Sequence, residues 1–477
     1  MAINLVSGVV MARLLAPGEY GVSVLGAAVV AIAEAIRALG GGAYIIQKKD
    51  LTTDNIRSSF TVNMSVTIIL TTALLLLSGP ATRYFLMPDL GRYLQVTALG
   101  YLTGPFVYPM SALMSRQMAF GTIALIGFVT ASVNAVASIF LAMQGFSFMS
   151  FAWAGAVSAV AGMLLYFYVW TDRSIFRLNP RGWRSVMAFG AHDSATAVLS
   201  QIAESLPYFM FGRLLNAEAV GLCQRAVMLC LVPERVILAG VGAVVLPAFS
   251  RQIREGRSLK HDYLRAIELI TAAQWPALLV LVLLAGPVVA VLLGPQWREV
   301  VPLIEILGTA LLFSFPVSLH YPTLVASGFI RYMPPLVVVQ AGLSLSILYV
   351  AARQGLHAAA LSMLLIVPLN ALISMTLVRF AVGFRWAEVA VATWKSAVCA
   401  AMSAAGPAAI LIATGPHADM PIVAAMLAGV LAGGGWIGGL WMTNHPLLHE
   451  GVRLAGAVRR RLVAADLGRI GARLRGR

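Results

Sequence analysis

Charged side chains stand inside two long apolar segments of the chain. Glu34 and Arg37 lie three residues apart, so in a helix they share one face and can pair. Arg225, Glu234 and Arg235 lie in a later segment. An arginine stays charged, and its planar guanidinium can bond two oxygens of one phosphate or carboxylate group. We therefore expect Arg37, Arg225 and Arg235 to bind an anionic group of a substrate, and Glu34 to belong to the same substrate-binding site.

A simpler interpretation of the same residues stays open. Glu34 with Arg37, and Glu234 with Arg235, are then local pairs that neutralise one another, or side chains that reach an interface along their flexible stems. In a segment that crosses a bilayer, a charge at the centre costs about 2.5–3.5 kcal/mol, so either pairing or function has to offset that cost.

A further ionisable group, His192, Asp193 and Glu204, lies within one apolar segment. Histidine titrates near neutral pH and a neighbouring carboxylate can tune it, so these residues form a candidate proton or sodium site for ion coupling. The alternative for His192 and Asp193 is that they face an aqueous vestibule, because Arg184 lies only about two helical turns away.

The composition indicates which solvent surrounds these segments. The chain has 477 residues, of which 60% are hydrophobic and 11% charged. A soluble domain carries about 25% charged residues and is less than half apolar. The chain is therefore predicted to be an all-α polytopic membrane protein, which argues against soluble enzymes and against nucleic-acid binding in spite of the net charge of +15.

A membrane-spanning helix needs about 20 mostly apolar residues. By that criterion we expect about fourteen transmembrane helices, with short connections and no soluble domain. The predicted spans lie near 1–15, 20–46, 59–82, 94–115, 119–143, 147–170, 185–211, 218–247, 265–294, 301–327, 333–352, 357–379, 389–414 and 420–443.

The basic residues collect on one side of this topology. Numbered from a cytoplasmic N-terminus, the even connections and the C-terminal tail hold most of them, and positive charge marks the cytoplasmic side. We therefore expect both termini in the cytoplasm. The odd connections hold only Arg13, Arg83, Arg92, Arg213, Arg298 and Arg353.

Matches at an offset of 200 residues indicate an internal repeat. Arg13-Leu14-Leu15 recurs as Arg213-Leu214-Leu215, and Gly21, Glu34 and Gly42-Ala43 fall opposite Gly221, Glu234 and Gly242-Ala243. Two six-helix halves with the same orientation are a transporter architecture, with the substrate site between the halves. The predicted divisions are an N-lobe at 1–172, a C-lobe at 185–383, two extra helices at 386–445 and a basic amphipathic cytoplasmic tail at 446–477.

The sequence also makes a prediction for the first helix and for the C-terminal tail. The repeat predicts that the first helix begins upstream of Met1, so it is expected to be truncated; a genuinely short helix is the alternative. The tail alternates Leu, Val and Ile with arginines, which fits a helix lying on anionic headgroups. The alternative is a solvated basic tail.

Several stretches resemble a known family. The resemblance covers most of residues 10–380 in the right order, and the chain is similar to bacterial flippases of the polysaccharide transporter branch of the multidrug/oligosaccharidyl-lipid/polysaccharide exporter superfamily. The stretches that carry it are Ala12 to Gly21, Leu39 to Asp50, Phe211 to Leu215, Leu246 to Arg251 and Leu293 to Trp297 with Val301 to Leu303.

This resemblance implies a two-lobed helical bundle that flips a lipid-linked (polyprenyl-diphosphate) oligosaccharide across the bacterial inner membrane by alternating access. Arg37 and Arg225 are then the first candidates to bind the diphosphate, and Arg235 the second. The chain departs from the family at Ala38, which follows Arg37, and at Pro207 and Tyr208, where the family often has Asp-Asn.

Two other functions remain as alternatives to export of an exopolysaccharide, capsule or O-antigen unit. One is a multidrug or toxin antiporter on the same fold, which usually has fewer helices and fewer arginines in its cavity. The other is a membrane polysaccharide polymerase or ligase, for which no odd connection is long enough. A polymerase and export machinery are expected partners. We expect no catalytic residue, no metal site and no cofactor beyond a coupling ion, and metal-ligand spacing is lacking at Cys223, Cys230 and Cys399.

Overall fold

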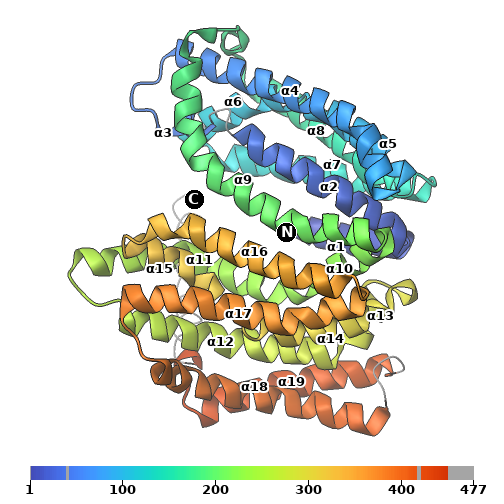
Figure 1. Ribbon diagram of the computed structural model, residues 1–477, viewed down its shortest axis with the longest axis vertical. Coiled ribbons are helices and arrows are strands. Elements are labelled where there is room, and N and C mark those ends of the chain that lie inside the picture. The colour runs from blue at the N-terminus through green and yellow to red at the C-terminus, as the bar shows by residue number, and fades with distance from the viewer. Residues whose placement is uncertain (1, 39–41, 416–419, 449–477) are drawn as a thin grey trace, which may run out of the picture. The chain divides into compact units, whose positions relative to one another are not determined.

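The computed structural model describes residues 2–38, 42–415 and 420–448 (Figure 1). Every regular element in these ranges is a helix, which confirms the all-α prediction. The side chains of 2, 4, 5, 43, 189–196 and 238–244 are outside the description. The side chains of the predicted coupling residues His192 and Asp193 therefore lie outside the described part of the structure.

The helices follow one another with short connections. The first half of the chain forms α1 (Ala2–Leu14), α2 (Pro17–Arg37), α3 (Gly42–Gln47), α4 (Thr53–Phe85), α5 (Pro88–Tyr101), α6 (Gly104–Arg116), α7 (Phe120–Met143), α8 (Met149–Val169) and α9 (Trp183–Leu214). The second half forms α10 (Ala217–Cys230), α11 (Val232–Arg254), α12 (Lys260–Leu283), α13 (Ala285–Leu292), the 3-10 helix η4 (Pro295–Trp297), α14 (Val300–Leu311), α15 (Val317–Ala326), α16 (Met333–Ala352), α17 (Leu356–Val382), α18 (Trp386–Thr414) and α19 (Ile422–Met442).

In the part of the chain that the structure describes, nine helices are long and apolar enough to cross a membrane. They are α2, α4, α7, α8, α12, α16, α17, α18 and α19. Each predicted span coincides with one helix or with two consecutive helices. The multi-pass membrane class is thus confirmed, whereas the count of fourteen crossings stays a prediction.

Proline explains why several predicted spans consist of two helices. Pro105 and Pro233 stand in the first turns of α6 and α11, and Pro316 directly precedes α15. Proline has no N–H to donate and its ring clashes with the preceding turn, so it starts a helix more readily than it continues one. The apolar segments at 94–115, 218–247 and 301–327 are therefore each interrupted.

The chain folds into two compact units that interleave along the sequence. The first unit comprises Met1–Ala226, Val289–Leu303 and Val337–Ser362. The second comprises Val227–Val288, Ile304–Leu336 and Met363–Arg477. The first unit thus contains α1 to α9, most of α10 and α16, η4 and the ends of α13, α14 and α17.

Within the first unit, α4 lies beside α5 and α7 beside α8 (Figure 1). A core of buried apolar side chains joins α3, α4, α6, α7 and α8, and includes Ile45, Ile56, Met110 and Ile126. The turn after α1 recurs 200 residues later as the turn after α9. The helices before these turns, α1 and α9, end at Leu14 and Leu214, and the helices after them, α2 and α10, begin at Pro17 and Ala217. The repeat in the sequence is therefore a repeat in local structure here.

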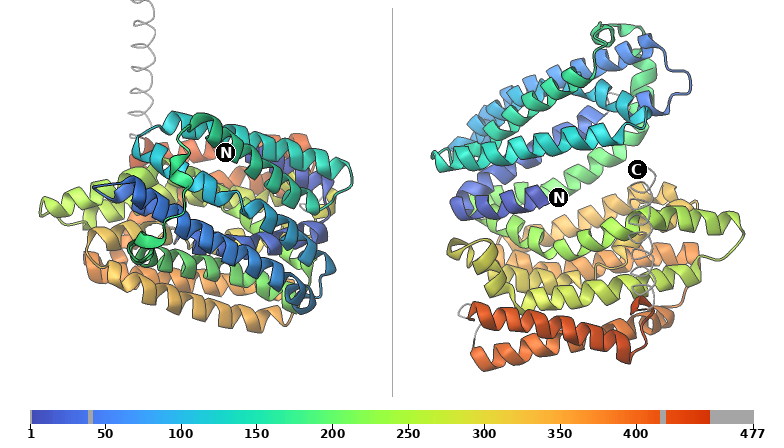
Figure 2. Two further views of the ribbon diagram at one scale, coloured as in Figure 1. Left: turned by 90° about the horizontal axis from the view of Figure 1, so that it is seen from above. Right: turned by 180° about the vertical axis from the view of Figure 1, so that it is seen from behind.

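Within the second unit, α18 packs against both α12 and α19, and α18 and α19 run side by side (Figure 2). Two glycines four residues apart on α19 allow that approach. A Cβ at Gly435 would overlap the backbone oxygen of Met402, and one at Gly439 would lie 2.8 Å from the Cα of Cys399. Small residues at this spacing let helix backbones touch in lipid, where no hydrophobic effect drives association.

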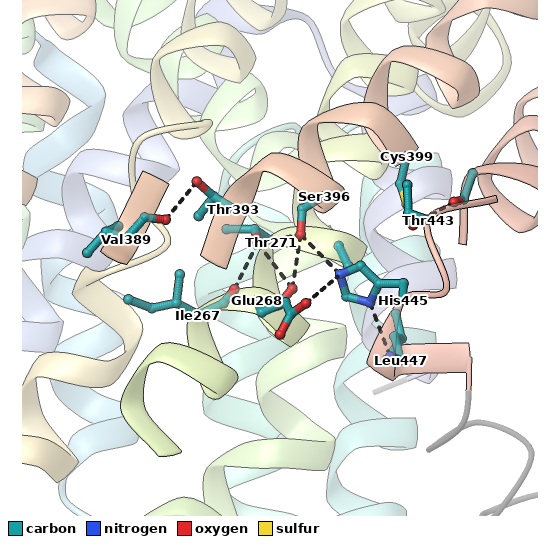
Figure 3. A network of polar contacts seen from close by, with 12 residues as sticks. Ile267, Glu268, Thr271, Val389, Thr393, Ser396, Cys399, Thr443, His445 and Leu447 are labelled. Atoms are coloured by element: carbon teal, nitrogen blue, oxygen red, sulfur yellow. Dashed lines mark hydrogen bonds and ion pairs between the residues drawn. The ribbon is translucent and has the colours of Figure 1, made fainter. Parts of the chain in front are cut away.

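Polar contacts also tie α12 and α18 to the segment that follows α19 (Figure 3). Ser396 Oγ donates to the backbone oxygen of Glu268 at 3.1 Å and lies 3.4 Å from His445 Nε2. The Leu447 N–H donates to His445 Nδ1 at 3.1 Å, so the imidazole carries its proton on Nε2 and is neutral. Burial, with a smaller contribution from the nearby ammonium of Lys395, lowers the pKa of His445 to about 4.

Large apolar side chains are exposed along several of the long helices. Ile69 and Leu76 of α4, Val136 of α7, Ile412 of α18 and Val430 of α19 are each more than half exposed. A soluble monomer rarely shows apolar surface on this scale. These faces are suited to contact lipid acyl chains.

Gly435→Ala tests the contact between α18 and α19. The added methyl group collides with backbone, which cannot rotate away, so we expect a loss of about 1–3 kcal/mol in unfolding free energy. Gly434→Ala is the matched control, because nothing lies within 4 Å of a Cβ there, and its higher helix propensity should be neutral or stabilising. Thermal unfolding of the purified protein in detergent measures both; equal melting temperatures would contradict the packing.

Candidate functional site

Arg37 ends α2 and is largely buried. Its side chain is 11% exposed, and it forms an ion pair with Glu34, one helical turn earlier, whose own side chain is 51% exposed. The predicted pair of Glu34 and Arg37 therefore exists. Glu34 contacts the guanidinium of Arg37 through Nη2, so it pairs with only some of the N–H donors of Arg37.

Two tyrosines frame the guanidinium. Its central carbon lies 4.9 Å from the ring centroid of Tyr101, at the end of α5, and 5.6 Å from that of Tyr108 on α6. The ring faces attract a cation when water is excluded. The Nε of Arg37 is buried and finds no hydrogen-bond partner among the described residues.

A cavity of about 230 Å³ adjoins Arg37. Thr97 and Thr103 contribute polar side chains to its wall. The rest of the wall includes small residues that leave the cavity open, namely Gly100, Gly104, Gly155, Ala156 and Ala159. A Cβ at Gly104 would overlap the guanidinium of Arg37. The glycine therefore leaves the space that the buried cation occupies.

Arg225 on α10 is buried in a different setting, an aromatic cluster of Tyr20 and Trp297. Only 2% of Arg225 is exposed. Its guanidinium carbon lies 3.8 Å from the ring centroid of Tyr20 and 5.4 Å from that of Trp297. The two rings meet edge to face, with centroids 5.8 Å apart. Trp297 Nε1 also donates to the backbone oxygen of Ala12 at 2.7 Å, which attaches η4 to α1.

The first turns of α2 and α10 touch at two glycines. A Cβ at Gly21 would overlap the backbone oxygen of Ala217, and a Cβ at Gly221 would overlap that of Pro17. Since Gly21 and Gly221 are repeat-equivalent, the contact is reciprocal between the two helices. This close crossing places Tyr20 of α2 directly against Arg225 of α10.

The structure keeps Arg37 and Arg225 apart. Tyr20, which touches Arg225, precedes Arg37 by 17 residues on the same helix, a distance of about 25 Å at 1.5 Å per residue. One diphosphate cannot reach both arginines in this conformation. Of the two, Arg37 lies beside a cavity and Arg225 is enclosed by rings.

The other predicted site residues lie elsewhere. Arg235 is exposed on α11, and the neighbouring Glu234 accepts a hydrogen bond from Ser318 Oγ at 2.9 Å. Glu204 is exposed on α9. No group of three or more His, Cys, Asp or Glu side chains that could hold a metal ion occurs among the described residues.

Sequence reasoning did not identify the aromatic partners of either arginine. Tyr20 and Trp297 stand inside two of the stretches that carry the family resemblance, and the structure brings these stretches together. Their position in these two stretches could have identified Tyr20 and Trp297 as candidates from the sequence. Tyr101 and Tyr108 had no such signal, because a tyrosine in an apolar helix is ordinary core composition.

Comparison with known families gives a match over residues 10–302 to the family described as "Polysaccharide biosynthesis protein". Among curated proteins, the chain is 23% identical over 317 residues to the lipopolysaccharide biosynthesis protein WzxC of Escherichia coli (strain K12), covering 64% of this chain and 63% of that protein. It is 24% identical over 324 residues to the succinoglycan biosynthesis transport protein ExoT of Rhizobium meliloti (strain 1021), covering 67% and 65%.

The match to the teichuronic acid biosynthesis protein TuaB of Bacillus subtilis (strain 168) is 22% over 281 residues, covering 58% of each chain. The matches thus span less than two thirds of the length of these relatives. Among solved structures, the lipid II flippase MurJ superposes with a TM-score of 0.71 at 12% identity, covering 94% of this chain and 97% of that one. An inward-facing multidrug resistance MATE family transporter gives 0.64 at 16%, covering 80% and 94%. The fold is shared with both.

Substitutions of Tyr20 test the cluster around Arg225. Tyr20→Leu removes the ring face from a buried cation and is expected to lower the unfolding free energy by about 1–2 kcal/mol, whereas Tyr20→Phe keeps the ring and most of the stability. The control is Tyr84→Leu, because Tyr84 is 60% exposed and its contact with Arg213 is 5.4 Å. Unfolding in detergent is the measurement, and a Tyr20→Leu variant as stable as Tyr20→Phe would refute the interpretation.

Proposed function

The chain belongs to the polysaccharide biosynthesis protein family, and from this premise we propose that it flips a lipid-linked oligosaccharide across the bacterial inner membrane. The cargo is the repeat unit of an exopolysaccharide, capsule or O-antigen on a polyprenyl-diphosphate carrier. Both termini lie in the cytoplasm, and a polysaccharide polymerase with its export machinery takes up the product. The protein acts as a transporter and makes or breaks no covalent bond.

The relatives support polysaccharide rather than drug export. The names of three of them refer to lipopolysaccharide, teichuronic acid and succinoglycan biosynthesis. The fold alone does not discriminate, because a lipid II flippase and a multidrug transporter both superpose on this chain. A buried arginine favours an anionic cargo, since an organic cation would be repelled by it.

The observation that carries the proposal is the position of Arg37 beside its cavity. A diphosphate oxygen accepts from the guanidinium of Arg37 where it lines the cavity, while Glu34 and the rings of Tyr101 and Tyr108 hold the guanidinium in place. The cavity of about 230 Å³ is smaller than the roughly 300–1,000 Å³ of sites that enclose drug-sized ligands. It therefore receives the diphosphate group, while the sugars and the polyprenyl chain extend beyond it.

Alternating access requires one end of the molecule to close and reopen. Within the first unit, the starts of α2 and α10 cross at Gly21 and Gly221, and η4 attaches to α1 through Trp297. The predicted topology puts all these connections on the outer side. In our proposal this cluster is the outer closure, and Arg225 leaves the rings of Tyr20 and Trp297 when the outer side opens.

Coupling to a proton or sodium gradient is the remaining part of the proposal. Glu204 is the candidate among the described residues, because it is exposed on α9 and a carboxylate can take up a proton or bind a sodium ion. His192 and Asp193 on the same helix complete the group. No cofactor is invoked.

Variants at the Arg37 cavity test the substrate site. Arg37→Ala removes a charged hydrogen-bond donor and should lower transport tenfold or more, while Arg37→Lys keeps the charge without the planar fork and retains part of the activity. Gly104→Ala should also impair transport, because its Cβ displaces the guanidinium. Gly127→Ala on α7 is the matched control, because Gly127 does not line the cavity and nothing lies within 4 Å of a Cβ there. A fully active Arg37→Ala would remove Arg37 from the site.

Deletion of the gene tests the function itself. We expect loss of surface polysaccharide and accumulation of the lipid-linked intermediate on the cytoplasmic leaflet, measured by leaflet-selective labelling and lipid extraction. Complementation with Gly127→Ala should restore export, and complementation with Arg37→Ala should not. Intact polysaccharide export with altered dye efflux would instead identify a drug antiporter.

A further inference from the structure

The second unit holds a separate pocket that the proposed transport does not use. Its volume is about 840 Å³, and it lies between the beginnings of α12 and α18 and the segment after α19. Its ionisable lining consists of His261, Arg265 and Glu268 from the α12 side, and Arg385, Glu388 and Lys395 from the α18 side. It shares no residue with the cavity at Arg37.

Helical spacing explains why these side chains meet. His261, Arg265 and Glu268 recur at intervals of four and three along α12 and so line one face. Glu388 and Lys395 stand seven residues apart, or two turns, on α18. Since α12 packs along α18, the two faces confront each other across the pocket.

The pocket carries an excess of positive charge. Lys260 bonds Glu388 at 2.7 Å, and His445, which lies 3.9 Å from Glu268, is neutral in the network of Figure 3. Among the described residues of the lining, three cations, at Arg265, Arg385 and Lys395, face Glu268 and Glu388, and Glu388 is already paired with Lys260. Two positive charges remain for a ligand.

The rim of the pocket is apolar and open. Val391 and Trp394 line it from α18 and are 68% and 51% exposed. The helices α12, α18 and α19 are all candidate membrane spans. The pocket lies where α12 and α18 begin and α19 has ended, which is headgroup depth, and tryptophan is enriched at that depth.

We propose that this pocket binds the phosphate of an anionic phospholipid headgroup, with the acyl chains lying against Val391 and Trp394. Arg265, Lys395 and Arg385 bond the phosphate oxygens. The apolar rim distinguishes a lipid from a soluble phosphate compound, which would have no use for it. The predicted topology puts the site in the cytoplasmic leaflet.

The test uses the full-length protein in detergent and native mass spectrometry with two lipids of matched acyl chains. Phosphatidylglycerol should bind in preference to phosphatidylcholine. Arg265→Gln and Lys395→Gln should each weaken phosphatidylglycerol binding about fivefold. Glu268→Gln removes an opposing carboxylate and should strengthen binding by a similar factor.

Arg257→Gln is the matched control, since this arginine belongs to a connection on the same side but is 70% exposed and outside the pocket. It should leave the affinity unchanged. Equal binding of both lipids, or an equal loss in Arg257→Gln, overturns the proposal. Displacement of the lipid by glycerol phosphate at a comparable concentration would instead assign the pocket to a soluble phosphate compound. If Arg265→Gln lowers the melting temperature without lipid, Arg385→Gln on the opposite wall replaces it.

Discussion

The contact between α2 and α10 at Gly21 and Gly221 is the constraint on which the first unit depends. Each glycine faces a backbone carbonyl of the other helix, so neither position has room for a side chain. The crossing places Tyr20 against the guanidinium of Arg225, and Trp297 packs beside Tyr20 and also contacts the guanidinium. A buried cation is costly without compensation, and two ring faces in a water-free setting supply part of it.

Three arginines lie in distinct settings, and we propose a different task for each. Arg225 is enclosed by rings at a helix crossing, which is the outer closure in our proposal. Arg37 is buried beside a cavity with one donor facing no protein partner among the described residues, where it can bind a diphosphate. Arg265, in the second unit, faces an open pocket with an apolar rim, where it can hold a lipid headgroup.

The elements were predictable because helical structure in lipid depends on local composition. Every backbone polar group must be satisfied within its own segment, so an apolar stretch of sufficient length becomes a helix. The interruptions at Pro105 and Pro233 were not predicted, because proline also lies inside α4, α9 and α12 without ending them. The turn after α9 repeats the turn after α1 at the offset that the sequence showed.

The sequence by itself determined the solvent, the helical class, the family and the pair of Glu34 with Arg37. All of these depend on composition or on residues within one turn of each other. Only the tertiary structure decided that Arg37 and Arg225 lie far apart and that Tyr101, Tyr108 and Trp297 are their partners. Those contacts join residues that are more than sixty positions apart, and they depend on how whole helices pack, which no local periodicity encodes.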